Sequence, residues 1–276
     1  MIDRLLQSLP SFKGKQRLAR FLFKKEIRRG KEFNVIGKWN CIYKLPNISE
    51  NVGFEIMLNG VYESTTINFI IKQINHNGLF LDIGANIGAI TIPVSQLRQD
   101  IKLISIEAAP WIFDYLTYNV TANQLLNVEL INKAVTDKAG NQVDFFSPKD
   151  KFGKGSLAPV FTEASVRIET ITLDVLKADH HRPIAFIKVD VEGFEAAVFR
   201  GGADLLSASE APDILFEFID WAEDLAGEIT GAAQLVLINY GYRIYLMERG
   251  KIGQQLRAPI KKGGALIFAT KKKGKV

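Results

Sequence analysis

Three charged residues stand at alternate positions after an apolar stretch, and their types suit proton transfer. Lys188, Asp190 and Glu192 follow the segment Ile184 to Ile187. Side chains at alternate strand positions begin on one face, and a charged trio inside a core would be costly without partners. We therefore expect the trio at the carboxyl end of a strand, facing a cleft. There a carboxylate can take a proton from a hydroxyl; a structural ion-pair cluster that locks the turn is the alternative.

A glycine-containing turn forms a second group of candidate residues. The turn Gly84-Ala85-Asn86-Ile87-Gly88 follows the apolar segment Leu79 to Ile83, within which Asp82 stands close to the turn. Glycine lets the backbone approach a ligand closely, and free amides at the start of the next helix suit an anionic group. The spacing lacks the three glycines of the dinucleotide fingerprint. Asp82 is placed to receive the amino group of an amino-acid-like ligand; a tight turn without any ligand is the alternative.

Glu107 ends the next apolar segment, Lys102 to Ile106. An acid at this place can accept hydrogen bonds from both hydroxyls of a ribose. The alternative is a strand end that faces solvent. Glu107 therefore indicates a ribose-containing ligand, but this residue alone does not distinguish one ribose-containing cofactor from another.

The charged trio, the glycine-containing turn and Glu107 can form one site only if they follow parallel strands that end at the same edge of a sheet. From Gly78 onward, short apolar strands alternate with helices, which indicates a doubly wound α/β sheet. The predicted strands cover 79–83, 102–106, 128–132, 184–189, 213–218, 242–247 and 264–269. The predicted helices include 64–76, 110–122, 194–207 and 229–239. The last two strands lack a long helix between them and are separated by Arg249 to Gly253, so the sequence predicts that they pair antiparallel at the sheet edge.

Over roughly residues 55–220 the sequence resembles the FkbM family of methyltransferases. The most specific similarity is Ile187-Lys188-Val189-Asp190-Val191-Glu192-Gly193-Phe194-Glu195. Further similarity lies in the segment Asp82 to Gly88, in Glu107-Ala108-Ala109-Pro110, in Asn119 and Asn123, and in Ala134 to Gly140. Asn86 stands where many methyltransferases have glycine, and Ala108 stands where proline is more usual in the family.

The resemblance implies a class I methyltransferase fold, S-adenosylmethionine as cofactor, and methyl transfer to oxygen on a sugar, glycolipid or natural product. With the motifs above it predicts these cofactor-binding residues: Asp82, Gly84, Ala85, Asn86, Gly88, Glu107, Ala134, Val135 and Asp137. Methyl transfer is an in-line displacement in which the attacking hydroxyl loses its proton. Asp190 is our first candidate for the base and Glu192 the second. Lys188 holds one of them ionised, or acts itself if its pKa is lowered.

Other functions remain open at this point. An NAD-linked oxidoreductase would need the missing three-glycine fingerprint, and a non-catalytic binding protein would leave the charged trio away from the ligand. Amino-methylating nucleic-acid enzymes carry a proline-containing motif where Asp190-Val191-Glu192-Gly193 stands here. Asp190 and Glu217 could share a magnesium ion, but we expect no metal. The polar segment Lys151 to Leu157 is expected near the cleft, over the acceptor.

The chain of 276 residues has a formal charge of +5 that is concentrated at its ends. Residues 13–31 hold many lysines and arginines with a single acid, and Lys271 to Lys275 form a second cluster. We interpret residues 1–35 as a basic, helical lead-in and 36–276 as a methyltransferase domain with a cofactor-binding core at about 78–220. Leu18, Phe21 and Leu22 fall at helical spacing among the bases, as in a membrane-surface helix.

The composition favours a folded cytoplasmic protein with peripheral membrane contact through this lead-in. Hydrophobic residues make up 47% and charged residues 24%. No apolar run approaches the ~20 residues that cross a bilayer. The single cysteine, Cys41, permits no internal disulfide and fits a reducing compartment. Solvated ends without a partner are the plain alternative; a phosphorylated lipid carrier or an acidic glycan is another possible anionic partner.

Overall fold

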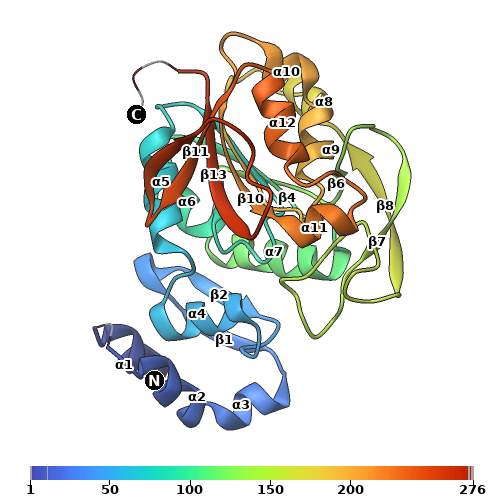
Figure 1. Ribbon diagram of the computed structural model, residues 1–276. Helices are drawn as coiled ribbons and strands as arrows, with labels where there is room; N and C mark the ends of the chain where they lie inside the picture. The colour runs from blue at the N-terminus through green and yellow to red at the C-terminus, as the bar shows by residue number, and fades with distance from the viewer. Residues whose placement is uncertain (1, 11, 273, 275–276) are drawn as a thin grey trace.

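The centre of the molecule is an eight-stranded sheet with helices on both faces (Figure 1). The computed structural model describes residues 2–10, 12–272 and 274, so Lys273 and Lys275 of the C-terminal basic cluster lie outside the described residues. The strand order is β12-β11-β13-β10-β9-β3-β4-β5. The bounds are β3 Leu79–Ile83, β4 Lys102–Ile106, β5 Val128–Ile131, β9 Ile184–Val189, β10 Asp213–Ile219, β11 Arg243–Glu248, β12 Lys251–Leu256 and β13 Gly264–Thr270.

The strands from β10 to β5 are parallel, whereas β13 runs antiparallel to both β10 and β11. The predicted doubly wound, mostly parallel sheet with an antiparallel edge is thereby confirmed. The outermost strand, β12, pairs antiparallel with β11 and was not predicted. Lys251, Gln254 and Gln255 of β12 are exposed, so the strand lacks the apolar run by which the others are recognised.

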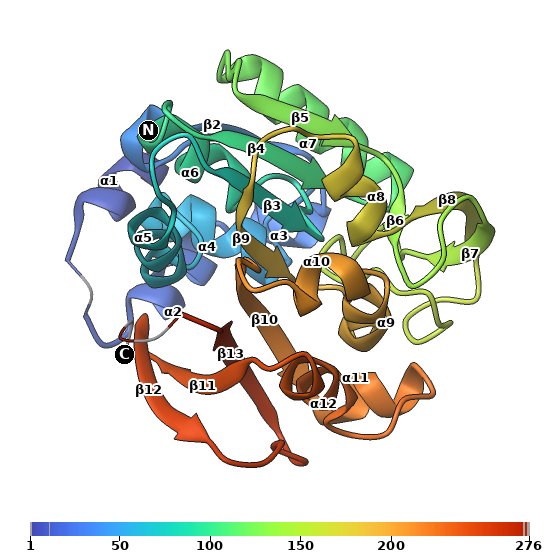
Figure 2. The ribbon, with the colours of Figure 1, turned by 90° about the horizontal axis from the view of Figure 1, so that it is seen from above.

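Alternation of side chains explains how the sheet is covered. Leu79, Leu81 and Ile83 of β3 pack in one core cluster, whereas Phe80 packs in another on the opposite face. The first face is covered by α8 Leu173–Ala178, α9 Glu195–Arg200, α10 Ala203–Ser207 and α12 Ala232–Asn239. The second is covered by α5 Ser64–Gln73 and α6 Thr91–Leu97 (Figure 2). Phe186 of β9 and Phe268 of β13 contact Phe69 of α5 there, and Phe80 of β3 contacts Phe186.

One predicted helix is interrupted. Residues 194–207 form α9 and α10, and the break falls at Gly201 and Gly202. A Cβ atom at Gly201 would lie 2.1 Å from the carbonyl oxygen of Thr136. The close approach of another segment therefore requires glycine here, and two glycines in a row weaken a helix.

The connections create a crevice at one edge of the sheet. From β3 the chain moves outward through β4 and β5, and it then returns to β9 on the other side of β3. The loops after β3 and β9 therefore leave in opposite directions. In open α/β sheets this switch point is where ligands bind.

The N-terminal segments form a layer below the sheet in Figure 1. They are α1 Ile2–Ser8, α2 Lys15–Leu22, α3 Lys24–Arg29, β1 Phe33–Ile36, the short 3₁₀ helix Lys38–Asn40, β2 Ile42–Leu45 and α4 Asn51–Asn59. Leu6, Ala19 and Phe23 are buried against this layer. Among the described residues, no helix is long and apolar enough to cross a membrane.

The asparagine pair of α7 (Pro110–Ala122 with its cap) joins this layer to the main sheet. Asn119 accepts from the amide of Lys44 at 2.7 Å and donates to the carbonyl of the same residue at 3.2 Å. Asn123 makes the same pair of bonds with Ile42, at 2.8 and 2.7 Å. The two asparagines are four residues apart and therefore lie on one helix face. Their side-chain amides pair with the backbone N–H and C=O groups of β2, as the backbone of a neighbouring strand would.

A small sheet lies beside the crevice. Its strands are β6 Ala134–Val135, β7 Gln142–Phe146 and β8 Ser165–Ile171, in the order β6-β8-β7. The remaining helix, α11 Asp220–Leu225, follows β10 directly. The segment between β7 and β8 includes residues 151–157, which reach back to the main sheet.

Candidate active site

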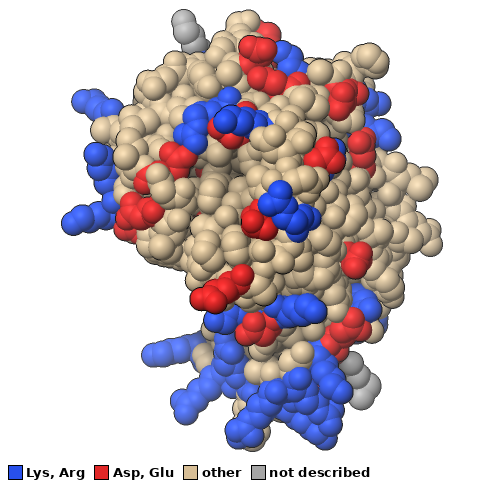
Figure 3. Space-filling view, turned by 90° about the vertical axis from the view of Figure 1, so that its right-hand side faces the viewer, with Lys and Arg blue, Asp and Glu red and all other residues tan. Residues whose placement is uncertain are grey.

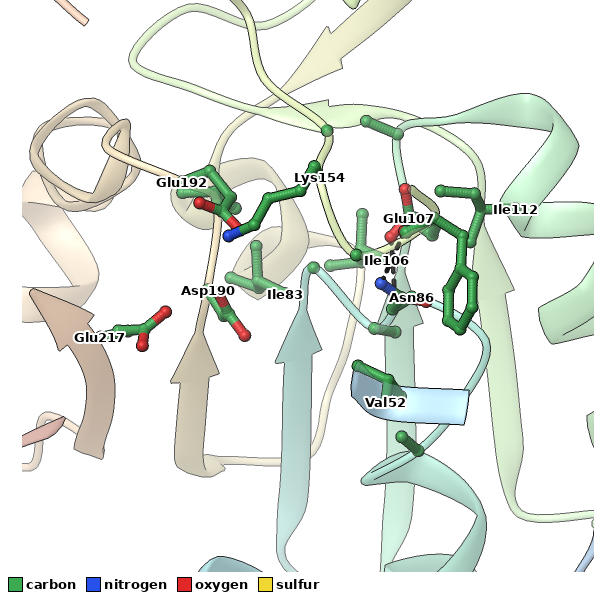
Figure 4. A pocket seen from close by; sticks show the side chains of 18 of the residues that line it. Val52, Ile83, Asn86, Ile106, Glu107, Ile112, Lys154, Asp190, Glu192 and Glu217 are labelled. Atoms are coloured by element: carbon green, nitrogen blue, oxygen red, sulfur yellow. Dashed lines mark hydrogen bonds and ion pairs between the residues drawn. The ribbon is translucent and has the colours of Figure 1, made fainter. Parts of the chain in front are cut away.

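A cavity of about 240 Å³ lies at the carboxyl ends of β3, β4 and β9. Most of the residues that the sequence predicted for the site line it. They are Gly84, Ala85 and Asn86 after β3, Glu107 after β4, Ala134 and Val135 of β6, and Lys188, Asp190 and Glu192 at the end of β9. Figure 4 shows Glu107 at one side of this cavity, and Asp190, Glu192 and Glu217 together at the other.

The turn after β3 has a conformation that its sequence dictates. Gly84 has φ +75°, and a Cβ atom there would lie 1.9 Å from the carbonyl oxygen of Asp190. Asn86 has φ +53° and donates its side-chain amide to the carbonyl of Phe152 at 3.0 Å. Asparagine tolerates this left-handed conformation better than most residues. It also ties the turn to the segment 151–157, of which Phe152, Gly153, Lys154, Gly155 and Leu157 line the cavity.

Glu107 is buried and accepts two backbone hydrogen bonds. Its Oε1 accepts from the amide of Ala109 at 2.8 Å, and its Oε2 from the amide of Asn86 at 2.9 Å. Burial raises the pKa of Glu107 to about 7, although the two amides act in the opposite direction. A carboxylate has about four acceptor sites, so each oxygen can still accept a bond from a ligand. Apolar side chains, including Ile106 and Ile112, surround this side of the cavity.

Asp82 was expected to receive a ligand's amino group, and it is not among the residues that line the cavity. It stands on the same face of β3 as Phe80, towards α6, where Oδ2 accepts from the hydroxyl of Thr91 at 2.6 Å. Its neighbour in the sheet register is Lys188, whose Nζ lies 3.7 Å from Oδ1. Asp82 is fully buried. Its contacts with Thr91 and Lys188 lie beneath the turn and stabilise it.

Gly88 and Asp137 are also away from the cavity wall. Gly88 has φ +89°, and a Cβ atom there would meet Ile92 and Leu116 at 3.0 Å. It therefore closes the turn against the core. Asp137 is exposed, because the chain is held by the bond from the Thr136 amide to the Ile171 carbonyl and then turns outward.

The charged side of the cavity contains two ion pairs. Lys188 Nζ lies 3.2 Å from Asp190 Oδ2, and Lys154 Nζ lies 2.8 Å from Glu192 Oε1. The predicted common face holds for Lys188 and Asp190. Glu192 has φ +52°, outside the strand conformation, and pairs with the segment 151–157 instead. Its Oε2 is buried and has no hydrogen-bond partner among the residues that the structure describes.

Lys188 is held in its charged form. Burial alone would lower its pKa, but the carboxylates of Asp190 and Asp82 outweigh burial and raise it. The idea that Lys188 is itself the base, which requires a lowered pKa, is therefore disfavoured. The geometry fits a positioning role instead, because Lys188 forms an ion pair with Asp190.

Sequence reasoning missed two contributors and undervalued a third. Tyr62 lies before α5, outside any motif, and gave no signal. Lys154 stands between two glycines in a segment that was only expected near the cleft. Glu217, considered as a metal ligand, lines the cavity with neither an ion pair nor a hydrogen bond from the described part of the chain. Glu217 is exposed, but the cavity walls desolvate its carboxylate, and this effect, followed by the charge of Asp190, raises its pKa to about 7.

The described residues contain no group of three or more histidine, cysteine, aspartate or glutamate side chains arranged to hold a metal ion. Asp190 and Glu217, the two carboxylates considered for magnesium, both line the cavity.

Comparison with known proteins gives a family match over more than half of the chain. Residues 82–244 match the family described as the methyltransferase FkbM domain. A curated protein of Methanosphaera stadtmanae, named "Probable ribosomal RNA small subunit methyltransferase A", is 33% identical over 75 residues, which are 26% of this chain and 27% of that protein. The chain thus aligns with about a quarter of that relative's length.

Two solved structures are similar at low identity. A TehB-like methyltransferase from Corynebacterium glutamicum has a TM-score of 0.46 at 11% identity, covering 79% of this chain and 94% of that one. A precorrin-6y C5,15-methyltransferase from Geobacter metallireducens has a TM-score of 0.44 at 14% identity, covering 76% and 88%.

Proposed function

This chain belongs to the FkbM family of methyltransferases and uses S-adenosylmethionine, and from that premise we propose that it methylates a hydroxyl of a sugar, glycolipid or natural product. One observation carries the proposal: a single cavity has a carboxylate suited to ribose, Glu107, at one side and a group of carboxylates suited to accept a proton at the other. Family membership favours the methyl donor over NAD. The charged trio lines the cavity, which argues against a non-catalytic role.

The residues fit the cofactor in three places. Glu107 would accept from the ribose hydroxyls, and the apolar side chains around it would cover the adenine. The backbone at Gly84 to Asn86 would lie against the amino-acid part. Glu192 Oε2, buried without a partner among the described residues, would accept from the ammonium group. Asp82 and Gly88 would act by positioning the turn, and Asp137 has no part in this proposal.

When bound, S-adenosylmethionine supplies a methyl group whose bond to sulfur breaks as the bond to the acceptor oxygen forms. Asp190 would receive the proton that the acceptor hydroxyl loses, and would pass it to solvent, since its side chain is 39% exposed. Lys188 would hold the Asp190 carboxylate in place through their ion pair. Lys154 holds one oxygen of Glu192 and so fixes the orientation of that carboxylate.

We expect loss of the gene to remove one methyl group from a glycan or lipid of the host. Polysaccharide and lipid extracts of cells with and without the gene would be compared by mass spectrometry, and the missing 14 Da would be located on an oxygen or on another atom. Complementation with the native gene should restore the mass. A methyl group lost from nitrogen or carbon would contradict the proposed reaction.

We also propose that the N-terminal helices contact an anionic membrane. Leu5, Leu18, Phe21 and Leu22 are exposed, Phe21 by 74%. Figure 3 shows lysines and arginines gathered over the lower part of the molecule, where Figure 1 places α1, α2 and α3. Exposed apolar side chains among bases are typical of interfacial helices. Each base near an anionic surface contributes about 1 kcal/mol, and salt screens this attraction.

Vesicle sedimentation tests this contact. We expect the protein to sediment with vesicles of phosphatidylglycerol and phosphatidylcholine at low salt, and the double variant Leu18→Gln, Phe21→Gln to stay mostly in the supernatant. Burying a large apolar side chain contributes ~1.5–3 kcal/mol. Leu126→Gln with Ile229→Gln is the matched control, since both residues are exposed elsewhere. Equal sedimentation of both double variants would refute the contact. Deletion of residues 1–31 is a poorer test, because it removes the buried Leu6, Ala19 and Phe23.

A further inference from the structure

A second cavity, of about 280 Å³, adjoins the first. The two share Tyr62, Lys188, Asp190 and Glu217 as lining residues. The second cavity extends from the ends of β9 and β10 towards β13 and β11, between the start of α5 and the turn that joins β11 to β12. No residue of the turn Gly84 to Asn86 lines it, and neither does Glu107. It is therefore separate from the side of the site that the proposed function assigns to the cofactor.

The junction of the two cavities is where a methyl group would pass from one molecule to the other. Methyl transfer joins two molecules in one site, and the reacting atoms must be in line. Asp190, the proposed proton acceptor, lines both cavities. A molecule in the second cavity would therefore meet Asp190 from the side opposite Glu107.

The lining of the second cavity combines hydrogen-bonding groups with an apolar part. The carboxylates of Glu63, Asp190 and Glu217 accept hydrogen bonds, and the Arg249 guanidinium donates them. Leu215, Met247 and Leu266 supply apolar surface. Hydroxyl groups can donate to the carboxylates and accept from the guanidinium, whereas the C–H groups of a ring can lie on the apolar side chains. A flat apolar acceptor would leave these polar groups without partners, which is costly.

Backbone conformation and packing fix the positions of Glu63 and Arg249, which form the rim of this cavity. Glu63 has φ +45° and Arg249 has φ +52°, left-handed values that are uncommon outside glycine. A Cβ atom at Gly250 would lie 2.7 Å from Cβ of Thr65, so the β11–β12 turn packs directly on the start of α5. Neither Glu63 nor Arg249 has an ion-pair partner among the described residues. The Glu63 carboxylate accepts a hydrogen bond from the Tyr62 hydroxyl, and since a carboxylate has about four acceptor sites it can still accept from a ligand.

We propose that the second cavity is the acceptor subsite and binds a ring that carries several hydroxyl groups. Glu63 and Arg249 form hydrogen bonds with the hydroxyls of the ring that do not react. The reacting hydroxyl lies at the junction of the two cavities, beside Asp190. Tyr62 forms part of the wall between the two cavities. This inference rests on the proposed function and adds to it the place and the chemical class of the acceptor.

The test uses the full chain, labelled S-adenosylmethionine and defined probes. The probes are myo-inositol and the methyl glycosides of glucose, mannose, galactose and rhamnose, with catechol as a flat hydroxyl-bearing control. We expect a methyl ether on at least one polyhydroxylated ring and none on catechol. Glu63→Gln and Arg249→Gln should each raise KM for that ring by roughly 10- to 100-fold, since each removes one charge-assisted hydrogen bond.

Matched controls separate the subsite from the fold. Glu210→Gln and Arg257→Gln replace exposed residues elsewhere and should keep the native KM. All four variants should bind S-adenosylhomocysteine as the native protein does and melt at the same temperature. If the rim variants keep the native KM, or lose cofactor affinity or stability instead, the subsite is refuted and the proposed function stands. If the native protein methylates catechol or no ring at all, the acceptor class fails together with the subsite.

Discussion

Replacing Glu107 by alanine is expected to weaken the binding of S-adenosylhomocysteine by ~2–4 kcal/mol, or roughly 30- to 700-fold. Glu107 is buried and its oxygens already accept from the amides of Asn86 and Ala109. Two ribose hydroxyls would donate to the same carboxylate, and hydrogen bonds to a charged acceptor contribute ~1.5–3 kcal/mol each without being additive. Calorimetric titration measures the change. An unchanged dissociation constant would remove Glu107 from the cofactor site.

The same carboxylate should make the affinity of the native protein depend on pH. Burial raises the pKa of Glu107 to about 7, and donors from the ribose favour the ionised form. Affinity should therefore be full above this pKa and fall as pH drops through it, by roughly tenfold between pH 8 and pH 6. Glu107→Gln should abolish this dependence, whereas Glu129→Gln, on the exposed side of neighbouring strand β5, should retain it. NAD should give no heat of binding in any of these proteins.

The strands could be predicted because buried strands consist mainly of apolar residues. Parallel strands covered on both faces read as short apolar runs between turns, and β3, β4 and β9 begin and end where the sequence predicts. β12 escaped prediction because it is an edge strand with exposed polar residues. The break between α9 and α10 could have been anticipated from Gly201-Gly202, but the contact that requires it, with Thr136, lies far away along the chain.

The parts of the site that end a strand were also predictable, since carboxyl ends of parallel strands meet at one edge. Asp82 shares the face of Phe80 rather than the cavity side of the turn, a placement that the two-residue period of a strand already implies. Tyr62, Lys154 and Arg249 reach the cavities from outside the sheet. Their places depend on packing between distant segments, and no spacing in the sequence encodes it.

Asp190→Asn is expected to lower the rate of methyl transfer by ~10²–10⁴-fold, the usual contribution of a general base, while leaving cofactor affinity nearly intact. The substitution keeps the side-chain size, and the asparagine oxygen can still accept from Lys188, which lies 3.2 Å from Asp190 Oδ2. Lys188 also keeps Asp82 as a partner, 3.7 Å away. The cavity should therefore retain its shape. Single-turnover transfer to the acceptor found by mass spectrometry gives the rate, with a cofactor titration and a thermal melt of the same protein.

Two matched variants decide whether the proton goes to Asp190 or to a neighbour. Glu192→Gln removes a carboxylate that is already paired with Lys154, so its effect on the rate should be smaller and should appear partly in cofactor affinity. Glu217→Gln removes a carboxylate without a partner in the described chain, whose pKa is raised to about 7 by the desolvating cavity walls. If Glu217→Gln slows transfer more than Asp190→Asn, Glu217 is the base and Asp190 orients the acceptor. If all three variants transfer the methyl group at the native rate, none is a base, and catalysis rests on alignment of the two molecules. If Asp190→Asn unfolds, the pair with Lys188 is structural and the assignment of Asp190 as the base fails.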